Sequence, residues 1–535
     1  MRTKAWQVVT VLVVAALLLT ACGTPTPEVV EKEPTQAPTK KAEEVATTAP
    51  ASPDEPVYGG SLISVLGTSD TQGFKTWGDT TSTEMTLWTQ VYDTFVRYDD
   101  EYNIAGSLFE SWESDDAQTW TFKVRQGVKW HDGVDLVAQH FVDYIDTVLD
   151  PEAGASSETI DLFKDATYEA VDDYTFKLGL PRPDAALLDG FAAQWLSRPD
   201  DFDPEHPLGT GPFKFIEWKR NQHVKFEKNP DYWQEGLPYV DELTIMFVPD
   251  GSTRKAMLLS GEAHILQAVP LPEVEMLEKE ENIQLIKTPD QYMVSEYFFL
   301  MNCSQPPFDD ARVRRAINYA LDREAMLQTT FGYGWLKANP VAEGSWAYNP
   351  NAEYPKKQDM EKAKELMKEA GYEPGKPAFT VTLKYWKERP ENLQICQIAQ
   401  ANLAELGITV ELELLEIMQW VQKVLWDYEY EAALTSLVPR WDPNDQLGNC
   451  YTTDDGAALQ WENEEFLKYW QAGRATSDLE ERKEAYWKAQ EIAAQEAPCA
   501  ILNGSPAFAA ATSNVRGVVR YNRGKLWYER VWLVP

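Results

Sequence analysis

Residues 379–415 read FTVTLKYWKERPENLQICQIAQANLAELGITVELELL. Over 379–385, alternating β-branched and aromatic residues predict a strand. A helix is expected from about 391 to 406, where Gly407 ends it, and 408–415 then alternates strictly between apolar and polar residues. Two strands joined by one helix predict a right-handed crossover and parallel pairing.

The flanking segments extend this pattern. Asp359 stands at the start of a helix whose apolar residues follow helical spacing as far as Gly371. Downstream, apolar residues between 417 and 425 predict a third helix, and 431–438 predicts a third strand. The order β-α-β-α-β indicates an α/β body with a mostly parallel sheet.

The loops that follow these strands are the expected place for a ligand, because open α/β sheets bind ligands beyond the carboxyl ends of their strands. Two of the loops, 386–390 and 439–446, place a Trp beside an Arg and an acid. We therefore expect ligand contacts from Tyr385, Trp386, Arg389, Arg440, Trp441 and Asp442. In the alternative interpretation, Trp441 only seals the end of the sheet.

The bulk composition limits the possible partners. With 535 residues the chain is too long for one hydrophobic core, so two or three domains are expected. Its 85 Asp and Glu against 49 Lys and Arg give a net charge of −36. This balance argues against nucleic acid, since phosphate recognition needs clustered cations. The 20 Trp residues weakly favour a ligand cleft, because Trp offers a large, rigid contact surface.

Motifs for catalysis are absent. Neither G-x-S-x-G nor HExxH occurs, and the five His residues are isolated from partners at nucleophile or metal spacing. Among 85 acidic residues, a carboxylate pair at glycosidase spacing arises by chance. We therefore expect a binding protein rather than an enzyme.

The first 22 residues have the pattern of a bacterial lipoprotein signal peptide. Residues 8–19 form an apolar run that is too short to span a bilayer comfortably. The run ends in Leu19-Thr20-Ala21-Cys22, which resembles the lipobox, so we expect lipid on Cys22. A plain secretory peptide with a chance Cys is the alternative. No later stretch suits a transmembrane helix, so the protein is expected outside the cytoplasm, lipid-anchored to a bacterial membrane.

Residues 23–56 are rich in Pro, Thr, Ala and Glu and lack aromatic residues. Such a segment cannot bury enough surface to fold, so we expect a disordered tether that keeps the folded body near the membrane. The body retains four cysteines without CxxC or nearby His, so a zinc site is not expected and their disulfide state stays open: Cys303, Cys396, Cys450 and Cys499. We expect no bound metal and no cofactor.

Three longer stretches resemble a known family. They are NIAGSLFESWESDDAQTWTFKVRQGVKWHDGVDLVAQHFV (103–142), GTGPFKFIEWKRNQHVKFEKNPDYW (209–233) and FLMNCSQPPFDDARVRRAINYALDRE (299–324). The pattern of 209–233 predicts a β-hairpin, and that of 309–324 predicts an amphipathic helix begun by an Asp. Taken in order, the three stretches resemble the family 5 extracellular solute-binding proteins, which are the dipeptide-, oligopeptide- and nickel-binding receptors of ABC importers.

The resemblance implies a periplasmic-binding-protein-like α/β fold of type II, in which two lobes close on a ligand and one carries an inserted extra domain. Lobe I would comprise 57–96, 209–299 and 505–535, the inserted domain 97–208, and lobe II 300–504. Segments near Leu300–Asn302 and Leu502–Gly504 would form the hinge. We expect a monomer that works with ABC permease subunits in the membrane.

The resemblance also bears on the ligand contacts. In peptide-binding relatives, an Asp on the loop after the last strand takes the peptide's ammonium group, and Asp442 is the nearest candidate. Here Asp442-Pro443 follows Trp441 directly, so Asp442 alternatively matches a structural Asp-Pro turn. Arg440 would then suit a carboxylate or a hydroxyl-rich ligand. A further cleft loop of the relatives matches 67–77 and adds Asp70, Phe74 and Trp77.

A peptide is the expected ligand. An oligosaccharide is the alternative within the same type of receptor, because sugar faces stack on Trp. A surface sensor that transports nothing is a further alternative. The identity, length and affinity of the ligand do not follow from the sequence.

Overall fold

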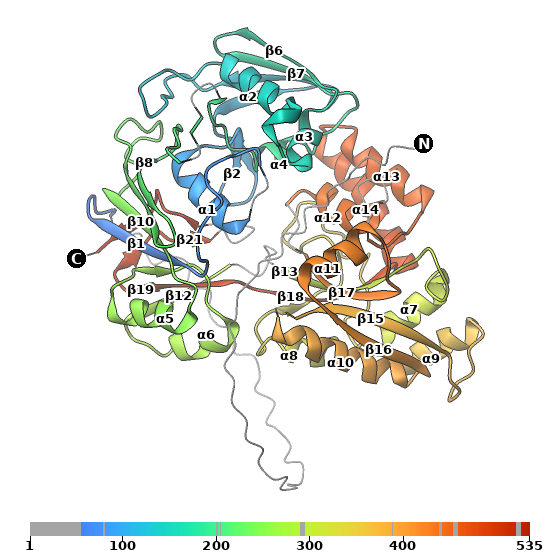
Figure 1. Ribbon diagram of the computed structural model, residues 1–535. Coiled ribbons are helices and arrows are strands. Elements are labelled where there is room, and N and C mark those ends of the chain that lie inside the picture. The colour runs from blue at the N-terminus through green and yellow to red at the C-terminus, as the bar shows by residue number, and fades with distance from the viewer. Residues whose placement is uncertain are drawn as a thin grey trace.

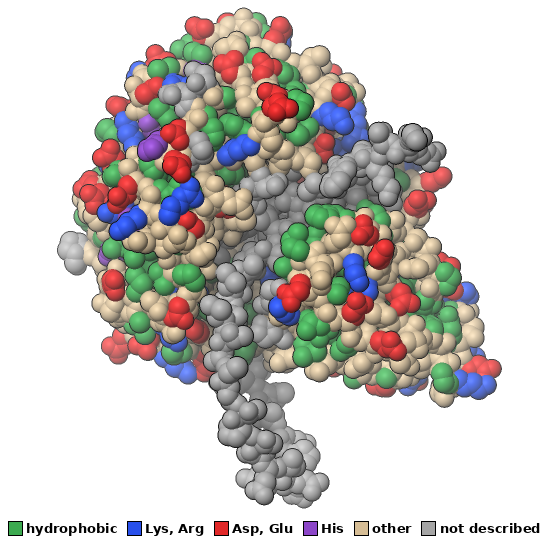
Figure 2. All heavy atoms as spheres, viewed as in Figure 1, with side chains coloured by type: hydrophobic (Ala, Val, Ile, Leu, Met, Phe, Trp, Pro, Cys, Tyr) green, Lys and Arg blue, Asp and Glu red, His purple; other side chains and the backbone are tan. Residues whose placement is uncertain are grey.

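The computed structural model describes residues 55–78, 81–199, 202–203, 205–288, 295–387, 389–437, 441–452, 458–520 and 526–534. Within these ranges the protein is built on three larger sheets, each with its own hydrophobic core (Figure 1). Lobe I lies at the left of Figure 1, the inserted domain at the top and lobe II at the right. Figure 2 shows acidic and basic side chains interspersed over the visible face.

The lobe I sheet has seven strands in the order β12-β19-β11-β1-β10-β9-β8. Their bounds are β1 Ser61–Leu66, β8 Phe213–Lys219, β9 His223–Lys228, β10 Glu242–Phe247, β11 Ile265–Leu266, β12 Ile283–Lys287 and β19 Phe508–Thr512. Strand β1 pairs in parallel with β10 and β11, and the other pairs are antiparallel. The hairpin predicted within 209–233 is confirmed as β8 and β9.

The helices that accompany this sheet are α1 Ser82–Val91, α5 Gly251–Ser260 and α6 Leu271–Leu277. Helix α1 begins with a capping box in which Thr81 and Glu84 satisfy each other's backbone groups. Short strand pairs complete the C-terminal tail: β20 Val515–Arg516 with β23 Trp532–Leu533, and β21 Val519–Arg520 with β22 Leu526–Trp527.

The inserted domain carries an antiparallel sheet in the order β4-β5-β7-β6. Its elements are β2 Val96–Tyr98, β3 Ile104–Gly106, β4 Phe109–Glu113, β5 Thr119–Val124, α2 Gln139–Leu149, the 3-10 turn Pro151–Ala153, α3 Ser157–Phe163, β6 Thr167–Asp172, β7 Thr175–Gly179 and α4 Leu187–Phe191. Stacked phenylalanines fill its core, with Phe109 4.3 Å from Phe141 and 4.5 Å from Phe122 between ring centroids.

The lobe II sheet has the order β14-β18-β13-β17-β15-β16 and contains the predicted β-α-β-α-β unit. That unit consists of β15 Phe379–Trp386, α10 Pro390–Ala404, β16 Ile408–Leu415, α11 Ile417–Trp420, a π-helix Val421–Trp426 and β17 Ala432–Leu437. Strand β15 lies between β16 and β17 and is parallel to both. The strand order therefore reverses at β15, which is the kind of switch point where α/β sheets form a crevice.

The mostly parallel sheet predicted for lobe II is wrong. Strand β13 (Ser295–Met301) pairs antiparallel with β17 and with β18 (Cys499–Ser505), and β14 (Trp335–Leu336) pairs antiparallel with β18. The sheet is mixed because β13 and β14 run opposite to β15, β16, β17 and β18. Strands β13 and β18 carry the chain between the lobes. The expected hinge segments lie at the ends of these two strands, and hinge motion there stays a prediction.

The remaining helices of lobe II cover the two faces of its sheet: α7 Ala311–Ala320, α8 Arg323–Gln328, α9 Met360–Glu369, α12 Pro443–Tyr451, α13 Glu464–Arg474 and α14 Leu479–Glu496. The predicted cap of α9 is confirmed, since the Asp359 carboxylate accepts the Lys362 backbone N–H at 2.9 Å. The strands of each larger sheet fall within the residue ranges expected for its domain, apart from β13 and β18. We call these two the crossing strands, because they run across the expected boundaries between the lobes. The exact division into domains stays a prediction.

Two further findings concern the described residues only. Among their helices, none has both the length and the apolarity to cross a bilayer. Cys303, Cys396 and Cys499 carry free thiols. Cys22, residues 23–54 and Arg440 lie outside the part of the chain that the structure describes.

Candidate binding site between the lobes

Trp441 is placed where three parts of the molecule meet. Its ring packs against Tyr102 with centroids 5.2 Å apart, and it clusters with Ala342, Tyr98 and Trp527. Ala342 belongs to lobe II, the two Tyr lie in the β2–β3 region of the inserted domain, and Trp527 lies in the C-terminal tail of lobe I. With 5% of its surface exposed, Trp441 is an interlobe side chain rather than part of the outer surface.

Asp442 has its carboxylate fully engaged. It caps α12 by accepting the Asn444 backbone N–H at 2.8 Å. Both of its oxygens also accept from Nη2 of Arg482, at 2.9 and 2.8 Å, and both residues are buried. Burial alone would lower the pKa of Arg482, but the Asp442 carboxylate outweighs it and the pKa is raised. This geometry favours the structural Asp-Pro turn over a free acid that waits for a ligand ammonium.

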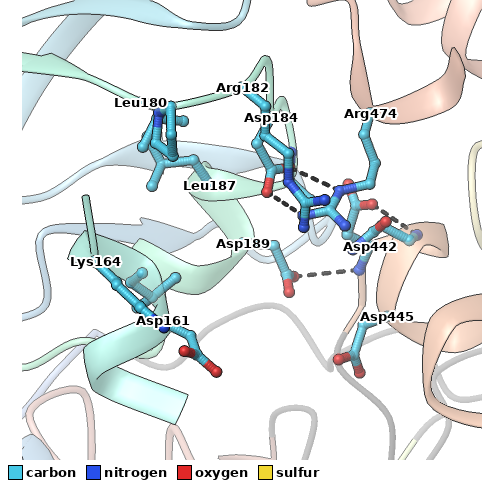
Figure 3. A pocket seen from close by; sticks show the side chains of 14 residues that line it. Asp161, Lys164, Leu180, Arg182, Asp184, Leu187, Asp189, Asp442, Asp445 and Arg474 are labelled. Carbon is cyan, nitrogen blue, oxygen red and sulfur yellow. Dashed lines mark hydrogen bonds and ion pairs between the residues drawn. The ribbon is translucent and has the colours of Figure 1, made fainter. Parts of the chain in front are cut away.

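A cavity of about 170 Å³ lies beside this corner, between the inserted domain and lobe II (Figure 3). Its charged lining consists of Asp161, Lys164, Arg182, Asp184 and Asp189 from the inserted domain, and Asp442, Asp445 and Arg474 from lobe II. Asp189 accepts the Asp442 backbone N–H at 3.2 Å and the hydroxyl of Tyr98. The cavity is therefore polar and more acidic than basic, with carboxylates contributed from both sides.

Tyr385 and Trp386, the last two residues of β15, pack in different hydrophobic cores on the two faces of the lobe II sheet. Trp386 is 1% exposed and meets Trp420 edge to face at 5.0 Å, within the core that also holds β17 and α14. Tyr385, its neighbour along the strand, faces the opposite core against α10. Ligand contact by either residue stays a prediction; in this conformation the pleat sends them to opposite faces of the sheet and both are covered.

Arg389 is half-buried and held by a short chain of hydrogen bonds. Its Nη1 donates to the Tyr297 hydroxyl at 2.9 Å, and that hydroxyl donates to Glu391 Oε1 at 2.9 Å. Burial alone would lower the pKa of Arg389, but Tyr297 and Glu391 raise it. Since Tyr297 belongs to crossing strand β13, this places Arg389 near the junction of the lobes.

The loop after β1 was expected to supply three ligand contacts, and in this conformation two of those side chains are buried. Phe74 has no exposed surface and packs in the lobe I core, 5.7 Å from Phe215. Trp77 is 4% exposed and packs on Phe202 at 4.6 Å. The Trp77 carbonyl accepts the Ser156 backbone N–H at 2.8 Å, so the loop joins lobe I to the inserted domain.

Asp70 from the same loop stays partly exposed. It accepts the indole N–H of Trp218 at 2.9 Å and the Thr71 backbone N–H at 3.0 Å. Of the predicted residues, Asp70 is partly exposed, and Arg389, Trp441 and Asp442 lie near the junction of the lobes. Arg440 lies outside the described residues.

Sequence reasoning missed Tyr102, Asp184, Asp189 and Arg474. Each acts through a partner far along the chain, since Asp442 lies 253 positions from Asp189 and Arg474 lies 290 positions from Asp184. Their local surroundings carry no motif or periodicity that would point to an interlobe role. Among the described residues no group of three or more His, Cys, Asp or Glu could hold a metal ion.

Comparison with protein families supplies the class. The model of the bacterial extracellular solute-binding proteins, family 5 middle region, matches residues 103–458, which is more than half of the chain. The chain therefore belongs to the bacterial extracellular solute-binding proteins of family 5. This confirms the resemblance drawn from the three sequence stretches, and with it a solute-binding rather than a catalytic protein.

Individual relatives give a closer view. The glutathione-binding protein GsiB of Escherichia coli is 30% identical over 446 residues, covering 80% of this chain and 85% of GsiB. The periplasmic binding protein DppA of Helicobacter pylori, solved with the peptide STSA, has a TM-score of 0.72 at 27% identity, covering 89% of this chain and 98% of DppA. AgaA of A. tumefaciens R10, solved with agropinic acid, has a TM-score of 0.72 at 26% identity, covering 89% of this chain and 99% of AgaA. The periplasmic-binding-protein fold is confirmed by these matches.

Proposed function

We propose that this chain is the solute-binding subunit of an ABC importer and that it captures a small peptide-like solute by closing its lobes. Trp441 is the observation that carries the proposal, because its ring joins all three parts of the molecule at the corner predicted from the sequence. A solute bound there contacts both lobes at once and so stabilises the closed form over the open one. The relatives that bind glutathione and the peptide STSA support a peptide-like solute.

The contacts available to such a solute come from aromatic faces and charged edges. Trp441 and Tyr102 offer flat surfaces for an apolar side chain. Arg389 provides a cation for a carboxylate, and Arg440, which directly precedes Trp441 in the sequence, is our second candidate. With Asp442 held by Arg482, the ammonium of a peptide must be met by another acid, and Asp189 and Asp445 at the adjacent cavity are our candidates.

An oligosaccharide is the second candidate ligand. The observation that favours it is the engagement of Asp442, which leaves the usual partner of a peptide ammonium occupied while the aromatic corner persists. A hydroxyl-rich solute both donates and accepts hydrogen bonds, so it does not depend on one free carboxylate as an ammonium group does. The peptide stays first because of the named ligands of GsiB and DppA.

We place the protein on the outer side of a bacterial membrane, held by lipid on Cys22 and by the tether of residues 23–56. A tether raises the effective concentration of the receptor near its permease without fixing its orientation. Treatment of cells with labelled palmitate tests the anchor directly: the wild-type chain should take up label and the Cys22→Ser variant should not.

The solute itself is identified by mass spectrometry of what the gently purified protein releases on denaturation. Fragments that break at amide bonds support the peptide, and losses of whole hexose units support the oligosaccharide. Calorimetric titration with glutathione and with the peptide STSA provides an independent measurement. A protein that releases no small solute and binds neither compound would remove solute capture as its function.

A further inference from the structure

The inserted domain and lobe II touch through a set of polar contacts at the cavity of Figure 3. The Ala185 backbone N–H donates to the Arg474 carbonyl at 2.8 Å, and the Asp442 backbone N–H donates to Asp189 Oδ1 at 3.2 Å. The Ser477 hydroxyl donates to the Ser114 carbonyl at 3.1 Å. Each bond has one partner in the inserted domain and the other in lobe II.

An ion pair stands at the centre of these contacts. Arg474 Nη2 lies 2.5 Å from Asp184 Oδ2, and Arg474 Nε donates to Asp184 Oδ1 at 3.4 Å, so the guanidinium meets both oxygens. The side chains are 13% and 22% exposed, which leaves little water to screen the attraction. Pairs of this two-point kind are the stronger charge-assisted contacts.

Both partners are held in place before they meet. Asp184 Oδ1 also accepts the Ala186 backbone N–H at 3.0 Å, which fixes the carboxylate ahead of α4. On the other side, the Arg474 guanidinium lies over the Trp470 ring at 4.8 Å, one turn earlier on α13. Little side-chain freedom is therefore lost when the ion pair forms.

The Asp184–Arg474 pair lies away from the two strands that connect the lobes, so it can resist the separation of the lobes. The chain passes between the lobes at β13 and β18, whereas α3 and α4 approach α12 and α13 at a separate place, toward the top of lobe II in Figure 1. The described chain makes no covalent connection at that separate place. Rotation about the crossing strands must therefore separate the inserted domain from lobe II and break these bonds.

We propose that Asp184 and Arg474 form a latch through which the inserted domain holds the closed state shut and so sets how long a solute is retained. The latch gives the inserted domain a role in closure that is separate from solute contact. Its biological meaning rests on the proposed function, but the latch itself is measurable without any solute.

Hydrogen exchange of the full-length, solute-free chain tests the latch, read by mass spectrometry on peptides that contain Ala185 and Asp442. Both amides are bonded across the contact and exchange when it opens. Asp184→Asn and Arg474→Gln should each speed exchange at Ala185 about tenfold, the effect of losing one charged hydrogen bond. The double variant should add little to the larger single effect, because both changes remove the same pair.

Asp135→Asn is the matched control. It removes the same charge from an ion pair inside the inserted domain, Lys129–Asp135, whose side chains are 44% and 62% exposed. The latch is rejected if both single variants exchange at Ala185 like this control, or if their effects simply add in the double variant. Failure of solute capture with the latch intact would instead reject the proposed function, since these exchange rates involve no solute.

Discussion

At the scale of single residues, the role of Asp442 is decided by Arg482, which lies 40 positions later in the chain. The sequence leaves two roles open for this acid, and the buried two-point contact favours the structural one. Trp386 and Phe74 also differ from what their local sequence indicates. Trp386 ends a strand and Phe74 lies in a loop, so both were expected at a cleft, but both side chains are buried in a core. Burial depends on neighbours that the local sequence does not specify.

Asp442→Asn should destabilise the protein by about 3 kcal/mol, because it leaves the Arg482 guanidinium buried without its counter-charge. Equilibrium denaturation in urea measures the change in the free energy of unfolding. The exposed-pair variant Asp135→Asn serves as control and should change the free energy by less than about 1 kcal/mol. Equal effects of the two substitutions would show that the Asp442–Arg482 pair has no special structural weight.

Trp441→Ala should weaken solute binding by about 2 kcal/mol, roughly a thirtyfold loss of affinity, because it removes a large buried anchor. Calorimetry with the solute released from the wild-type protein provides the measurement. Trp112→Ala, which changes a partly buried Trp on β4 away from the corner, is the control and should leave the affinity unchanged. An affinity that Trp441→Ala does not alter would take this ring out of the site.

Asp93 provides a pH test of the structure. Burial raises the pKa of Asp93 to about 6, against hydrogen bonds from Thr210, Trp233 and Tyr232 and the charge of Arg97, which lower it. The folded protein therefore keeps a proton that the unfolded chain releases, so the contribution of this group to stability is lost as the pH rises from about 4 through 6. A folded-state pKa near 6 implies that this loss is complete above about pH 8.

Relative to Asp93→Asn, the wild-type protein should be about 1.5 kcal/mol less stable at pH 8 than at pH 5, as the raised pKa requires. Urea denaturation of both proteins at the two pH values measures this difference of differences. Glu529, whose pKa burial raises to about 7, remains in both proteins and largely cancels. If the wild-type protein instead becomes more stable relative to the variant as the pH rises, the pKa of Asp93 is not raised by folding.

At the scale of elements, the strictly patterned segments are the ones that the sequence predicts well. Strand β16 has the bounds that its alternation indicates, and α9 begins at the Asp359 cap. The segment after β16 differs from the prediction, because a short α-turn followed by the π-helix Val421–Trp426 has nearly the same apolar spacing as one α-helix. The antiparallel direction of β13 relative to β17 could not be predicted from the sequence either, because pairing between distant strands produces no periodic pattern in the chain.

Gly504 on crossing strand β18 tests how tightly that element is packed. A Cβ at this position would lie 2.4 Å from the Trp335 ring, so Gly504→Ala must push β14 away from β18. We expect a loss of about 1–3 kcal/mol in thermal or urea denaturation, as overpacking usually gives. Gly251→Ala is the control, since its Cβ would meet only the end of Arg254 at 3.6 Å. An unchanged stability of Gly504→Ala would mean that β14 can move away from β18 at little cost in free energy.

At the scale of the whole molecule, family motifs predicted the fold, and local patterns pointed to Trp441, whose contact with a solute stays a prediction. Trp441 was found from its loop, yet its partners Tyr102 and Trp527 come from the inserted-domain side and the C-terminal tail, and no pattern in the chain linked them. No local pattern predicts the contact between the inserted domain and lobe II, because its partners lie far apart in the chain, as Asp184 and Arg474 do at 290 positions. Contacts of this kind follow from the arrangement of the lobes, not from the sequence of any one segment.

Small-angle X-ray scattering of the same preparation, stripped of its solute and then resupplied with it, tests closure most directly. The radius of gyration should fall when the solute is added to the wild-type protein, and at equal solute concentration it should fall less in Trp441→Ala. Binding that saturates by calorimetry while the radius of gyration stays constant in the wild-type protein would contradict capture by closing lobes.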